Sequence, residues 1–322
     1  MTSPAAPDGV DDPLVSELRA AGVTGAVHPG SSLAELTTLR VGGPARALVV
    51  ADRDADLAGV GAVCTTRGLP WLVVGRGSNL LVADAGWPGV AITLGRGYRG
   101  VEIEGTRARL GAAEPLPTVA VRLADAGLGG AAWAAGVPGT VGGAVRMNAG
   151  AHGGEVADHL VEIDLVRLRS GTRETWPAAA CGLSYRASEL PDDAVIVAAT
   201  WDLTPAERDV VRAEIKAVRD WRRAHQPLRD PNCGSVFANP PGDSAGRLIE
   251  AVGAKGLRIG GAEVSTKHAN FIVTRPGARA EDVVALIATV QDRVAAAHGV
   301  QLRAEVVVVG AAGGSPGGGG PR

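Results

Sequence analysis

The chain has 322 residues, of which 46% are apolar and 20% are charged, and its formal net charge is −2. This is the composition of a globular protein long enough for two or three domains. The near-zero net charge gives no overall attraction to nucleic acid or to an anionic membrane, so neither is expected as a partner.

Cysteine usage and the N-terminus both indicate a cytoplasmic protein. Cys64, Cys181 and Cys233 are an odd number, lie far apart and lack CxxC spacing, which predicts neither a disulfide framework nor a zinc site. The first twelve residues are acidic and no apolar segment follows them, unlike a secretory signal. Residues 1–12 and the Gly-rich end from Ala311 are predicted to be disordered because they have little to bury.

Three blocks of periodic structure lie between these ends. The first, residues 36–95, predicts a helix at 55–67 and strands at 47–50, 71–74 and 80–82. The second, residues 96–205, predicts a helix at 117–126 and strands at 101–103, 107–111, 160–167 and 194–203.

The third block begins with a clear amphipathic helix at 206–225, in which Val211, Ile215 and Val218 form one stripe. Arg222 continues this stripe, so its side chain is predicted to face the core side of the helix. An inward-facing arginine suits a residue that binds a phosphate or a carboxylate better than a solvent-exposed one. The rest of the block predicts strands at 234–238, 270–273 and 305–309 and helices at 245–252 and 281–297.

The first Gly-rich loop is VVGRGSNLLVAD, residues 73–84. A dinucleotide-binding Rossmann loop must open a helix, but here Leu80 replaces the third glycine and strand-like residues follow. We therefore reject a Rossmann domain and predict strand, loop, strand. A nest of backbone N–H groups that binds phosphate stays open at Gly75–Asn79.

The second Gly-rich loop is GVPGTVGGAVRMNAG, residues 136–150. It extends an uncharged run from Ala126 to Val145, long enough to suggest a membrane span, but that run holds seven glycines and a proline, so we reject the span. Glycines allow a backbone to approach a ligand closely, or they form a packed crossover between domains. Two such loops in neighbouring blocks favour a nucleotide-type cofactor.

Six segments carry a family resemblance. They are TTLRVGGPA (37–45), VGRGSNLLV (74–82), GVPGTVGGAVRMNAGAHGGEV (136–156), LSYRASEL (183–190), QPLRDPNCGSVFANPP (226–241) and AGRLIEAVGAKGLRIGGAEVSTKHANF (245–271). In this order they resemble the UDP-N-acetylenolpyruvoylglucosamine reductase family, over about residues 31–310. The short gap after the SYRAS motif resembles the family's second type, which lacks an extra tyrosine-bearing loop.

The resemblance implies an α+β fold with a two-subdomain FAD-binding portion of the vanillyl-alcohol-oxidase kind and a C-terminal α+β substrate domain. The implied division is 1–30 as a partly disordered N-terminal extension, 31–95 and 96–205 as the FAD-binding subdomains, 206–310 as the substrate-binding domain, and 311–322 as a disordered tail. A monomer is expected, with a weak dimer left open.

The implied reaction moves a hydride from NADPH to FAD and then to the enolpyruvyl double bond of the UDP-sugar, giving UDP-N-acetylmuramate for peptidoglycan. No separate NADPH fold is visible, and in the family NADPH and the UDP-sugar take turns in one pocket. Hydride addition to an unsaturated carboxylate builds negative charge there, so the site needs fixed positive charge and a proton donor.

Family motifs imply three catalytic residues. Arg186 would hold the substrate carboxylate, Ser235 would deliver the proton and Glu305 would polarise the carboxylate, a role open to both its ionised and its protonated form. Each residue also has a non-catalytic interpretation. Arg186 could be a surface arginine, Ser235 a strand serine hydrogen-bonded to the backbone, and Glu305 a charge on an edge strand. Cys233 lacks a histidine partner and is read as a packed bystander.

Further residues are implied as ligand contacts, and no metal is expected. Substrate contacts are Arg222, Asn239, Lys267 and His268, although for Lys267 and His268 a core or rim role is equally open. FAD contacts are Gly75, Arg76, Gly77, Ser78, Asn79, Gly136, Val137, Pro138, Gly139, Gly142, Gly143, Asn148 and Gly150. Two other functions stay open: a related flavoprotein acting on another substrate, and a non-catalytic nucleotide-binding protein.

Overall fold

The first block forms a four-stranded sheet with α2 packed on it and α1 beside α2. The computed structural model describes residues 12–310. The sheet order is β1-β2-β5-β3, with β2, β5 and β3 parallel and β1 antiparallel at one edge. The elements are α1 (Pro13–Ala20), β1 (Val27–Pro29), β2 (Ala45–Ala51), α2 (Asp54–Arg67), β3 (Trp71–Val73), β4 (Leu80–Val82) and β5 (Trp87–Leu94).

Helix α1 belongs to this block rather than to a loose extension. Asp12 caps its first turn by accepting a hydrogen bond from the Leu14 N–H at 2.9 Å, and Pro13 stands where a missing N–H costs nothing. Leu14 and Leu18 are fully buried in the core of the first block. The predicted extension therefore ends earlier than residue 30, and the disorder predicted for residues 1–11 and 311–322 lies outside the described residues.

The second block is a five-stranded antiparallel sheet, in the order β12-β11-β13-β7-β6, with α3 and α4 packed beside it. Its core gathers Trp201, Leu110, Leu116, Leu123 and Ile163. The elements are β6 (Val101–Glu104), β7 (Arg107–Gly111), α3 (Leu116–Asp125), β8 (Leu128–Gly129), α4 (Val141–Arg146), β9 (Gly150–Ala151), β10 (Gly154–Glu155), β11 (Leu160–Arg167), β12 (Arg173–Pro177), β13 (Ala194–Asp202) and β14 (Thr204–Pro205).

The first two blocks share one core. Val166, Leu168, Val195 and Val197 of the second block pack with α2 and the first sheet. Gly61 makes this approach possible, because a Cβ atom there would lie 1.8 Å from the carbonyl oxygen of Leu168. The two blocks are therefore fixed to one another through buried apolar surface.

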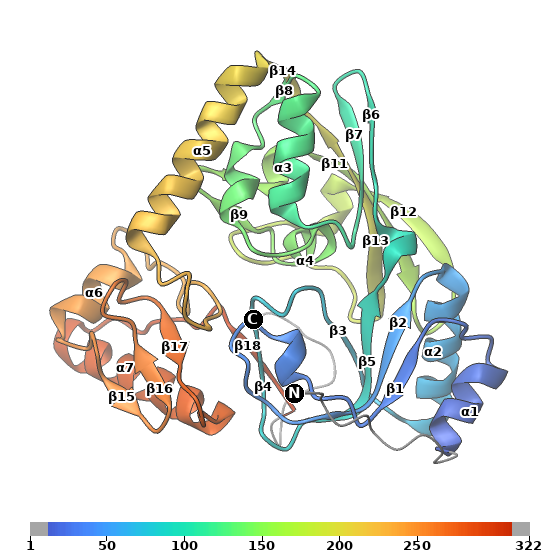
Figure 1. Ribbon diagram of the computed structural model, residues 1–322, viewed down its shortest axis with the longest axis horizontal. Helices are drawn as coiled ribbons and strands as arrows, with labels where there is room; N and C mark the ends of the chain where they lie inside the picture. The colour runs from blue at the N-terminus through green and yellow to red at the C-terminus, as the bar shows by residue number, and fades with distance from the viewer. Residues whose placement is uncertain (1–11, 311–322) are drawn as a thin grey trace, which may run out of the picture.

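The third block is smaller and lies apart from the two sheets, at the lower left of Figure 1. Three strands, β15-β16-β17, pair antiparallel beside α7, whose Val283, Ile287, Val290 and Val294 are buried at helical spacing. The elements are α5 (Arg208–His225), α6 (Ala245–Ala251), β15 (Arg258–Ile259), β16 (Ala262–Val264), β17 (Ile272–Thr274), α7 (Ala280–His298) and β18 (Val307–Val309).

Helix α5 connects the second and third blocks, as Figure 1 shows. Its Val211 and Ile215 are buried in the core of the second block, and its contacts are with α3 and the 3₁₀ turn at Ala132–Gly136. The sequence placed residues 206–225 in the substrate domain, whereas the packing joins the first half of the helix to the second block. We propose a domain boundary near residue 226.

The chain end returns to the first block. Strand β18 pairs parallel with β4, with Val307 opposite Leu80 and Val309 opposite Val82. This pairing brings the segment before β18 next to the first Gly-rich loop. It is the contact that lets the third block supply residues to a site built on the other two.

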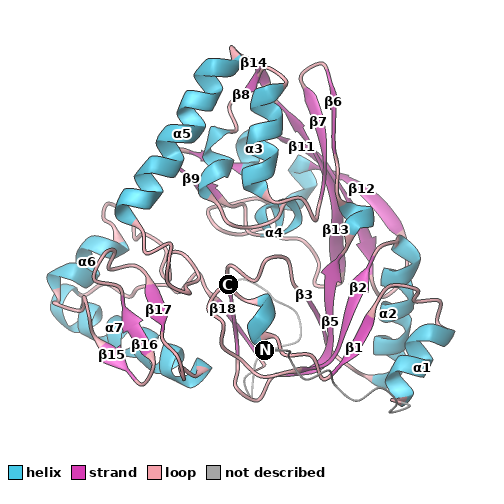
Figure 2. Cartoon of the chain, viewed as in Figure 1, coloured by secondary structure: helices cyan, strands magenta, loops and turns pink. Residues whose placement is uncertain are grey.

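Most predicted elements are confirmed to within two residues, and the strand, loop, strand reading of residues 71–82 is correct (Figure 2). The strand predicted at 234–238 is wrong, because this segment makes only one isolated bridge, between Phe237 and Ala304. The sequence reading missed α1, α4 and nine of the described strands, namely β1, β5, β8, β9, β10, β12, β14, β15 and β16. Among the described helices, none has the length and apolar character that crossing a bilayer requires.

Candidate active site

The two Gly-rich loops lie against each other. The backbone of Gly75 is so close to Thr140 that a Cβ atom at Gly75 would lie 2.8 Å from the Thr140 Oγ1. On the other side, the nearest atom to a Cβ built on Gly139 is the Ser78 Oγ, at 3.8 Å. Loops separated by about sixty residues in sequence therefore form one backbone-rich surface between the first two blocks.

This surface carries free backbone donors. Within residues 12–310, none of the N–H groups of Gly75–Asn79 donates a hydrogen bond, and the same holds for Gly139 and Thr140. Gly77 has φ 58°, a left-handed conformation that glycine adopts without strain, and the side chain of Arg76 is exposed. Successive N–H groups with no acceptor form a nest suited to an anion such as a pyrophosphate.

The rest of the second loop is more regular than the sequence predicted. Residues 141–146 form helix α4, capped by Thr140, whose Oγ1 accepts from the Gly143 N–H at 3.4 Å. The Gly142 N–H donates to the carbonyl oxygen of Ala112 at 2.9 Å. Gly142 and Gly143 were predicted as FAD contacts, but their N–H groups already donate within the protein. Gly139 and Thr140 are therefore the donors that this loop leaves free among the described residues.

Residues 136–138 precede these donors. The Val137 N–H donates to the carbonyl oxygen of Ala134, and Pro138 has no N–H to offer. A Cβ atom on Gly136 would lie 3.1 Å from the His152 ring and 3.3 Å from Val218 of α5. Gly136 is therefore packed closely between α5 and the hairpin β9–β10, where a side chain would displace its neighbours.

Arg186 lies in the loop before β13 with φ 58°, a left-handed conformation that is uncommon for a residue with a side chain. Its Nη2 donates to the carbonyl oxygen of Gly150 at 2.8 Å and its Nη1 to that of Asn148 at 3.4 Å. Its Nε lies 3.4 Å from the Glu305 Oε1. The predicted arginine and glutamate, from different blocks, therefore form one ion pair.

Glu305 stands just before β18, not within it, and its carboxyl side chain is only 14% exposed. Burial raises its pKa above the ordinary value, although Arg186 and Arg303 oppose that shift. Its backbone is held at both ends: Asn79 Nδ2 donates to the Glu305 carbonyl oxygen at 2.9 Å, and the Glu305 N–H donates to that of Val236 at 2.8 Å. A largely buried carboxyl group is thus fixed beside a guanidinium.

Ser235 is brought to the same place. Its neighbour Val236 binds Glu305 through the backbone, and the half-buried hydroxyl of Ser235 has no hydrogen-bond partner among the described residues. Burial, with a contribution from Glu305, raises the pKa of the nearby Cys233 thiol to about 12. This agrees with reading Cys233 as a bystander, while the hydroxyl of Ser235, one residue from the Glu305-bound Val236, stays unpaired among the described residues.

Asn148 and Gly150 serve the protein itself. The side chain of Asn148 is 1% exposed and makes three hydrogen bonds, to Glu155, Ser184 and Ala157. A Cβ atom on Gly150 would lie 2.6 Å from that of Glu155 across the β9–β10 hairpin. Both were predicted as FAD contacts. In the structure their own carbonyl oxygens accept hydrogen bonds from Arg186.

Arg222 and its surroundings lie at the C-terminal end of α5. The side chain is half-buried, burial lowers its pKa, and it forms no ion pair with a described carboxylate; its Nε donates to the Gln226 Oε1 at 2.9 Å. Burial and the Arg222 charge lower the pKa of His152 on the β9–β10 hairpin. A buried cation without an acid beside it is suited to a phosphate.

The other predicted substrate contacts also have protein partners. Asn239 Oδ1 accepts from the Ala245 N–H at 3.1 Å, at the start of α6, whose N-cap is Ser244. Lys267 Nζ donates to the carbonyl oxygen of Arg223 at 2.6 Å, which stabilises the C-terminal end of α5. His268 Nδ1 accepts from the Asn270 N–H at 3.2 Å. Lys267 is thus hydrogen-bonded to the residue that follows Arg222 in α5.

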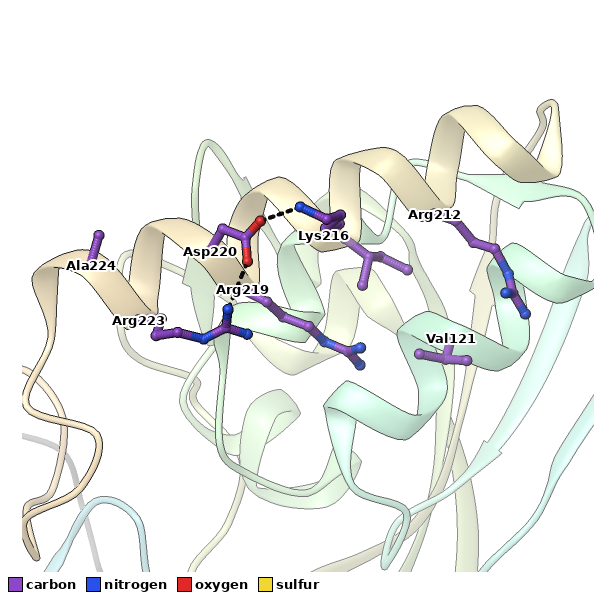
Figure 3. Close-up of a pocket in the computed structure, with 8 residues that line it drawn as sticks. Val121, Arg212, Lys216, Arg219, Asp220, Arg223 and Ala224 are labelled. Atoms are coloured by element: carbon purple, nitrogen blue, oxygen red, sulfur yellow. Dashed lines mark hydrogen bonds and ion pairs between the residues drawn. The ribbon is translucent and has the colours of Figure 1, made fainter.

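A separate cavity of about 760 Å³ runs along α5, and Figure 3 shows the residues that line it. Asp220 is paired there with Lys216 and Arg223, while Arg219 extends toward α3. The cavity is lined by Val121, Arg212, Ile215, Lys216, Arg219, Asp220, Arg223 and Ala224. None of these is a predicted site residue, so this basic groove is distinct from the Arg186–Glu305 pair.

Comparison with known proteins first defines the class. A family model described as an FAD binding domain matches residues 45–175, which include both Gly-rich loops. The free N–H groups around Gly75–Asn79 and Gly139 fit the pyrophosphate of such a cofactor, since no side-chain anion competes for them in the described chain. The protein is therefore an FAD-binding flavoprotein.

The particular family follows from the rest of the chain. A model described as the UDP-N-acetylenolpyruvoylglucosamine reductase C-terminal domain matches residues 226–309. Reductases of that name are 44% identical in Heliobacterium modesticaldum, over 88% of this chain and 91% of the relative, and 43% identical in Methylorubrum extorquens, over 92% and 96%. The chain belongs to the UDP-N-acetylenolpyruvoylglucosamine reductase family.

A solved structure agrees with this assignment. The UDP-N-acetylenolpyruvylglucosamine reductase from Thermus caldophilus is 36% identical and superposes with a TM-score of 0.76, covering 86% of this chain and 97% of its own. The α+β fold with an FAD-binding portion and a reductase C-terminal domain is thereby confirmed.

The sequence reading missed one residue at the site. Glu155 faces Arg186 from the β9–β10 hairpin, with 3.9 Å between its Oε2 and the Arg186 Nη1. It was within a quoted family segment, where it is the only carboxylate of residues 136–156. That isolated negative charge in a Gly-rich stretch was the signal that could have singled it out.

Proposed function

We infer that this protein reduces UDP-N-acetylenolpyruvoylglucosamine to UDP-N-acetylmuramate in peptidoglycan precursor synthesis, with FAD as its cofactor and NADPH as the hydride donor. Relatives carrying the reductase name align over about nine-tenths of the chain and of their own length. The observation that carries the site assignment is the ion pair between Arg186 and Glu305, with Ser235 beside it.

FAD is proposed to bind between the first two blocks. The backbone N–H groups of Gly75–Asn79, Gly139 and Thr140 would hold its pyrophosphate. When bound, FAD supplies the two-electron carrier that connects NADPH oxidation to reduction of the substrate double bond. Asn79 contributes its backbone to this nest, while its side chain holds Glu305.

Arg186 is proposed to bind the substrate carboxylate. A guanidinium has five N–H donors, and the protein occupies only part of them: Nη2 on Gly150, Nη1 on Asn148 and Nε toward Glu305. Donors remain for a carboxylate in which negative charge grows as hydride adds to the neighbouring double bond. Stabilising that charge more strongly than the ground-state carboxylate lowers the barrier.

Glu305 is proposed to act in its protonated form. Because burial raises its pKa, it can carry a proton and donate a hydrogen bond to the substrate carboxylate, where an ionised group would repel it. Ser235 is proposed to deliver the proton to the carbon next to the carboxylate. A serine hydroxyl is a weak acid, so it serves only beside a strongly basic, enolate-like intermediate.

Arg222 and Lys267 are proposed to contact the diphosphate of the UDP-sugar. Arg222 is a half-buried cation without a carboxylate partner, and Lys267 stands at the same end of α5. Asn239 could contribute its side-chain NH₂, since its oxygen is engaged at α6, and His268 the ring nitrogen that Asn270 does not use. A cytoplasmic monomer without nucleic-acid partners is proposed, since both nucleotide substrates are cytoplasmic metabolites.

The deciding experiment separates the two half-reactions. Under anaerobic conditions NADPH should bleach the flavin absorption near roughly 450 nm, and the enolpyruvyl UDP-sugar should then restore it. Failure of the UDP-sugar to restore it would exclude this substrate while leaving the flavoprotein class intact.

Ser235→Ala should keep NADPH oxidation by bound FAD nearly unchanged while lowering substrate reduction at least about a hundredfold, the scale of lost general acid catalysis. Ser170→Ala, at an exposed turn after β11, is the matched control and should behave as wild type. Equal losses in both half-reactions of Ser235→Ala would withdraw its role as proton donor.

A further inference from the structure

Arg186 lies between two carboxylates, not one. Its Nε is 3.4 Å from the Glu305 Oε1, and its Nη1 is 3.9 Å from the Glu155 Oε2. The two acids come from opposite sides, Glu305 from the segment before β18 and Glu155 from strand β10. The guanidinium is thus drawn toward the hairpin at one end and toward the third block at the other.

Glu155 is itself fixed by a buried amide. Asn148 Nδ2 donates to the Glu155 Oε1 at 3.1 Å and to the carbonyl oxygen of Ser184 at 2.9 Å. Ser184 is two residues before Arg186, so one side chain connects the carboxylate to the loop that carries the arginine. Asn148 Oδ1 also accepts from the Ala157 N–H at 2.9 Å, so this nearly inaccessible amide uses both of its donors and one acceptor site.

The hairpin brings Gly150 and Glu155 close together at the backbone. Gly150 and Glu155 pair directly across β9 and β10, and a Cβ atom on Gly150 would come within 2.6 Å of the Glu155 Cβ. The carbonyl oxygen of the same Gly150 accepts from the Arg186 Nη2. The hairpin therefore presents a carbonyl and a carboxylate to the two terminal nitrogens of one guanidinium.

We propose that Glu155 is a positioning residue for Arg186: held by Asn148, it anchors the Nη1 end of the guanidinium and leaves Nε beside Glu305. This inference rests on the proposed role of Arg186 in binding the substrate carboxylate. A misplaced Arg186 guanidinium affects binding of the substrate carboxylate and not of FAD. Removing Glu155 is therefore expected to slow only the half-reaction in which the UDP-sugar reoxidises the reduced flavin.

A purely structural role for Glu155 predicts a different result. Glu155 is also the N-cap residue of the 3₁₀ turn Val156–Asp158, and the Asp158 Oδ2 accepts from the Glu155 N–H at 2.8 Å. Aspartate caps such turns at least as well as glutamate, but its carboxylate is one methylene shorter and retracts from Arg186. Glutamine keeps the length and an acceptor for Asn148 but loses the charge.

The order of the variants therefore decides between the two roles. Positioning predicts that Glu155→Asp lowers kcat/KM for the UDP-sugar at least about tenfold and that Glu155→Gln loses less, about threefold. Both should keep FAD affinity and the rate of flavin reduction by NADPH within about twofold of wild type. Capping alone predicts that Asp equals wild type and that any loss lies in Gln. Glu104→Gln, an exposed carboxylate on β6, is the matched control.

The outcomes of this experiment distinguish failure of the positioning role from failure of the proposed function. A wild-type rate of substrate reduction in Glu155→Asp, or parallel losses in both half-reactions, overturns the positioning role. If Glu155→Asp does not fold, Glu155→Gln decides, and a wild-type kcat/KM for it also overturns the role. If reduced wild-type protein is not reoxidised by the UDP-sugar at all, the proposed function itself fails, which is a separate observation.

Discussion

Replacing Gly139 by alanine tests whether the second Gly-rich loop touches the cofactor through its backbone. The added methyl group meets nothing closer than the Ser78 Oγ at 3.8 Å and the Val137 Cγ1 at 3.9 Å, both ordinary contact distances. The backbone of Gly139 is not left-handed, so alanine can adopt its conformation. The cofactor-free protein should therefore be slightly stabilised, by about 0.4 to 1 kcal/mol, because alanine restricts the unfolded chain.

FAD binding should respond in the opposite direction. The Gly139 N–H has no acceptor within residues 12–310, and we assign it to the pyrophosphate. A methyl group beside this donor displaces a hydrogen bond to a charged group, which is worth about 1.5 to 3 kcal/mol. The FAD dissociation constant should rise about tenfold to a hundredfold.

The assay combines FAD titration, followed by quenching of flavin fluorescence, with urea unfolding of the cofactor-free protein. Gly143→Ala is the matched control, because its Cβ would lie 3.5 Å from the Thr140 Oγ1 and its N–H is already donated to that oxygen. It should leave FAD affinity within about twofold. Unchanged FAD affinity in Gly139→Ala, or an equal loss in the control, would refute the assignment of Gly139 to the nest.

Two further predictions concern titratable groups. Burial raises the pKa of Glu305, so its ionised form opposes folding: the penalty is absent below the ordinary pKa near 4.5 and grows as pH rises through the folded value. Glu305→Gln should therefore lose substrate reduction yet unfold at higher urea concentration at pH 7.5 and not at pH 4, and equal shifts at both pH values would contradict this. Burial also raises the pKa values of Cys64 and Cys233 to about 12 and that of Cys181 above its ordinary value. At pH 8 about one thiol in ten thousand of the first two is ionised, so a disulfide reagent should detect no fast thiol in the native protein and three after unfolding, whereas a fast native thiol would refute it.

Local patterns were enough for most elements and for the family. The stripe of α7 appears in sequence because burial on one face requires it, and the apolar run of β2 appears because both faces of this strand are buried. Residues 71–82 were read correctly because the position of the third glycine distinguishes a helix-opening loop from a turn between strands. The strand predicted at 234–238 was wrong, since the apolar Val236–Ala238 is buried as an irregular segment between Asn270 and the residues before β18.

Helix α4 shows why the second Gly-rich loop was harder to predict. Its two glycines and two valines have poor helix propensity, so composition favours a loop. The helix forms because its N–H groups find acceptors from elsewhere, the carbonyl groups of Ala112 and Glu114 and the hydroxyl of Thr140. Such partners are set by the packing of the second block and leave no local signal.

Sequence by itself determined which chemical groups this protein carries: two Gly-rich backbones, an arginine, a serine and a glutamate in motifs that imply a flavin-dependent reductase. Only the tertiary structure decided how they meet. It paired Arg186 with Glu305, placed Glu155 opposite, and committed the side chains of Asn79 and Asn148 to the protein. The physical reason is that hydrogen bonds and ion pairs across a domain junction depend on chain segments brought together by burial of distant apolar surface, which local periodicity does not record.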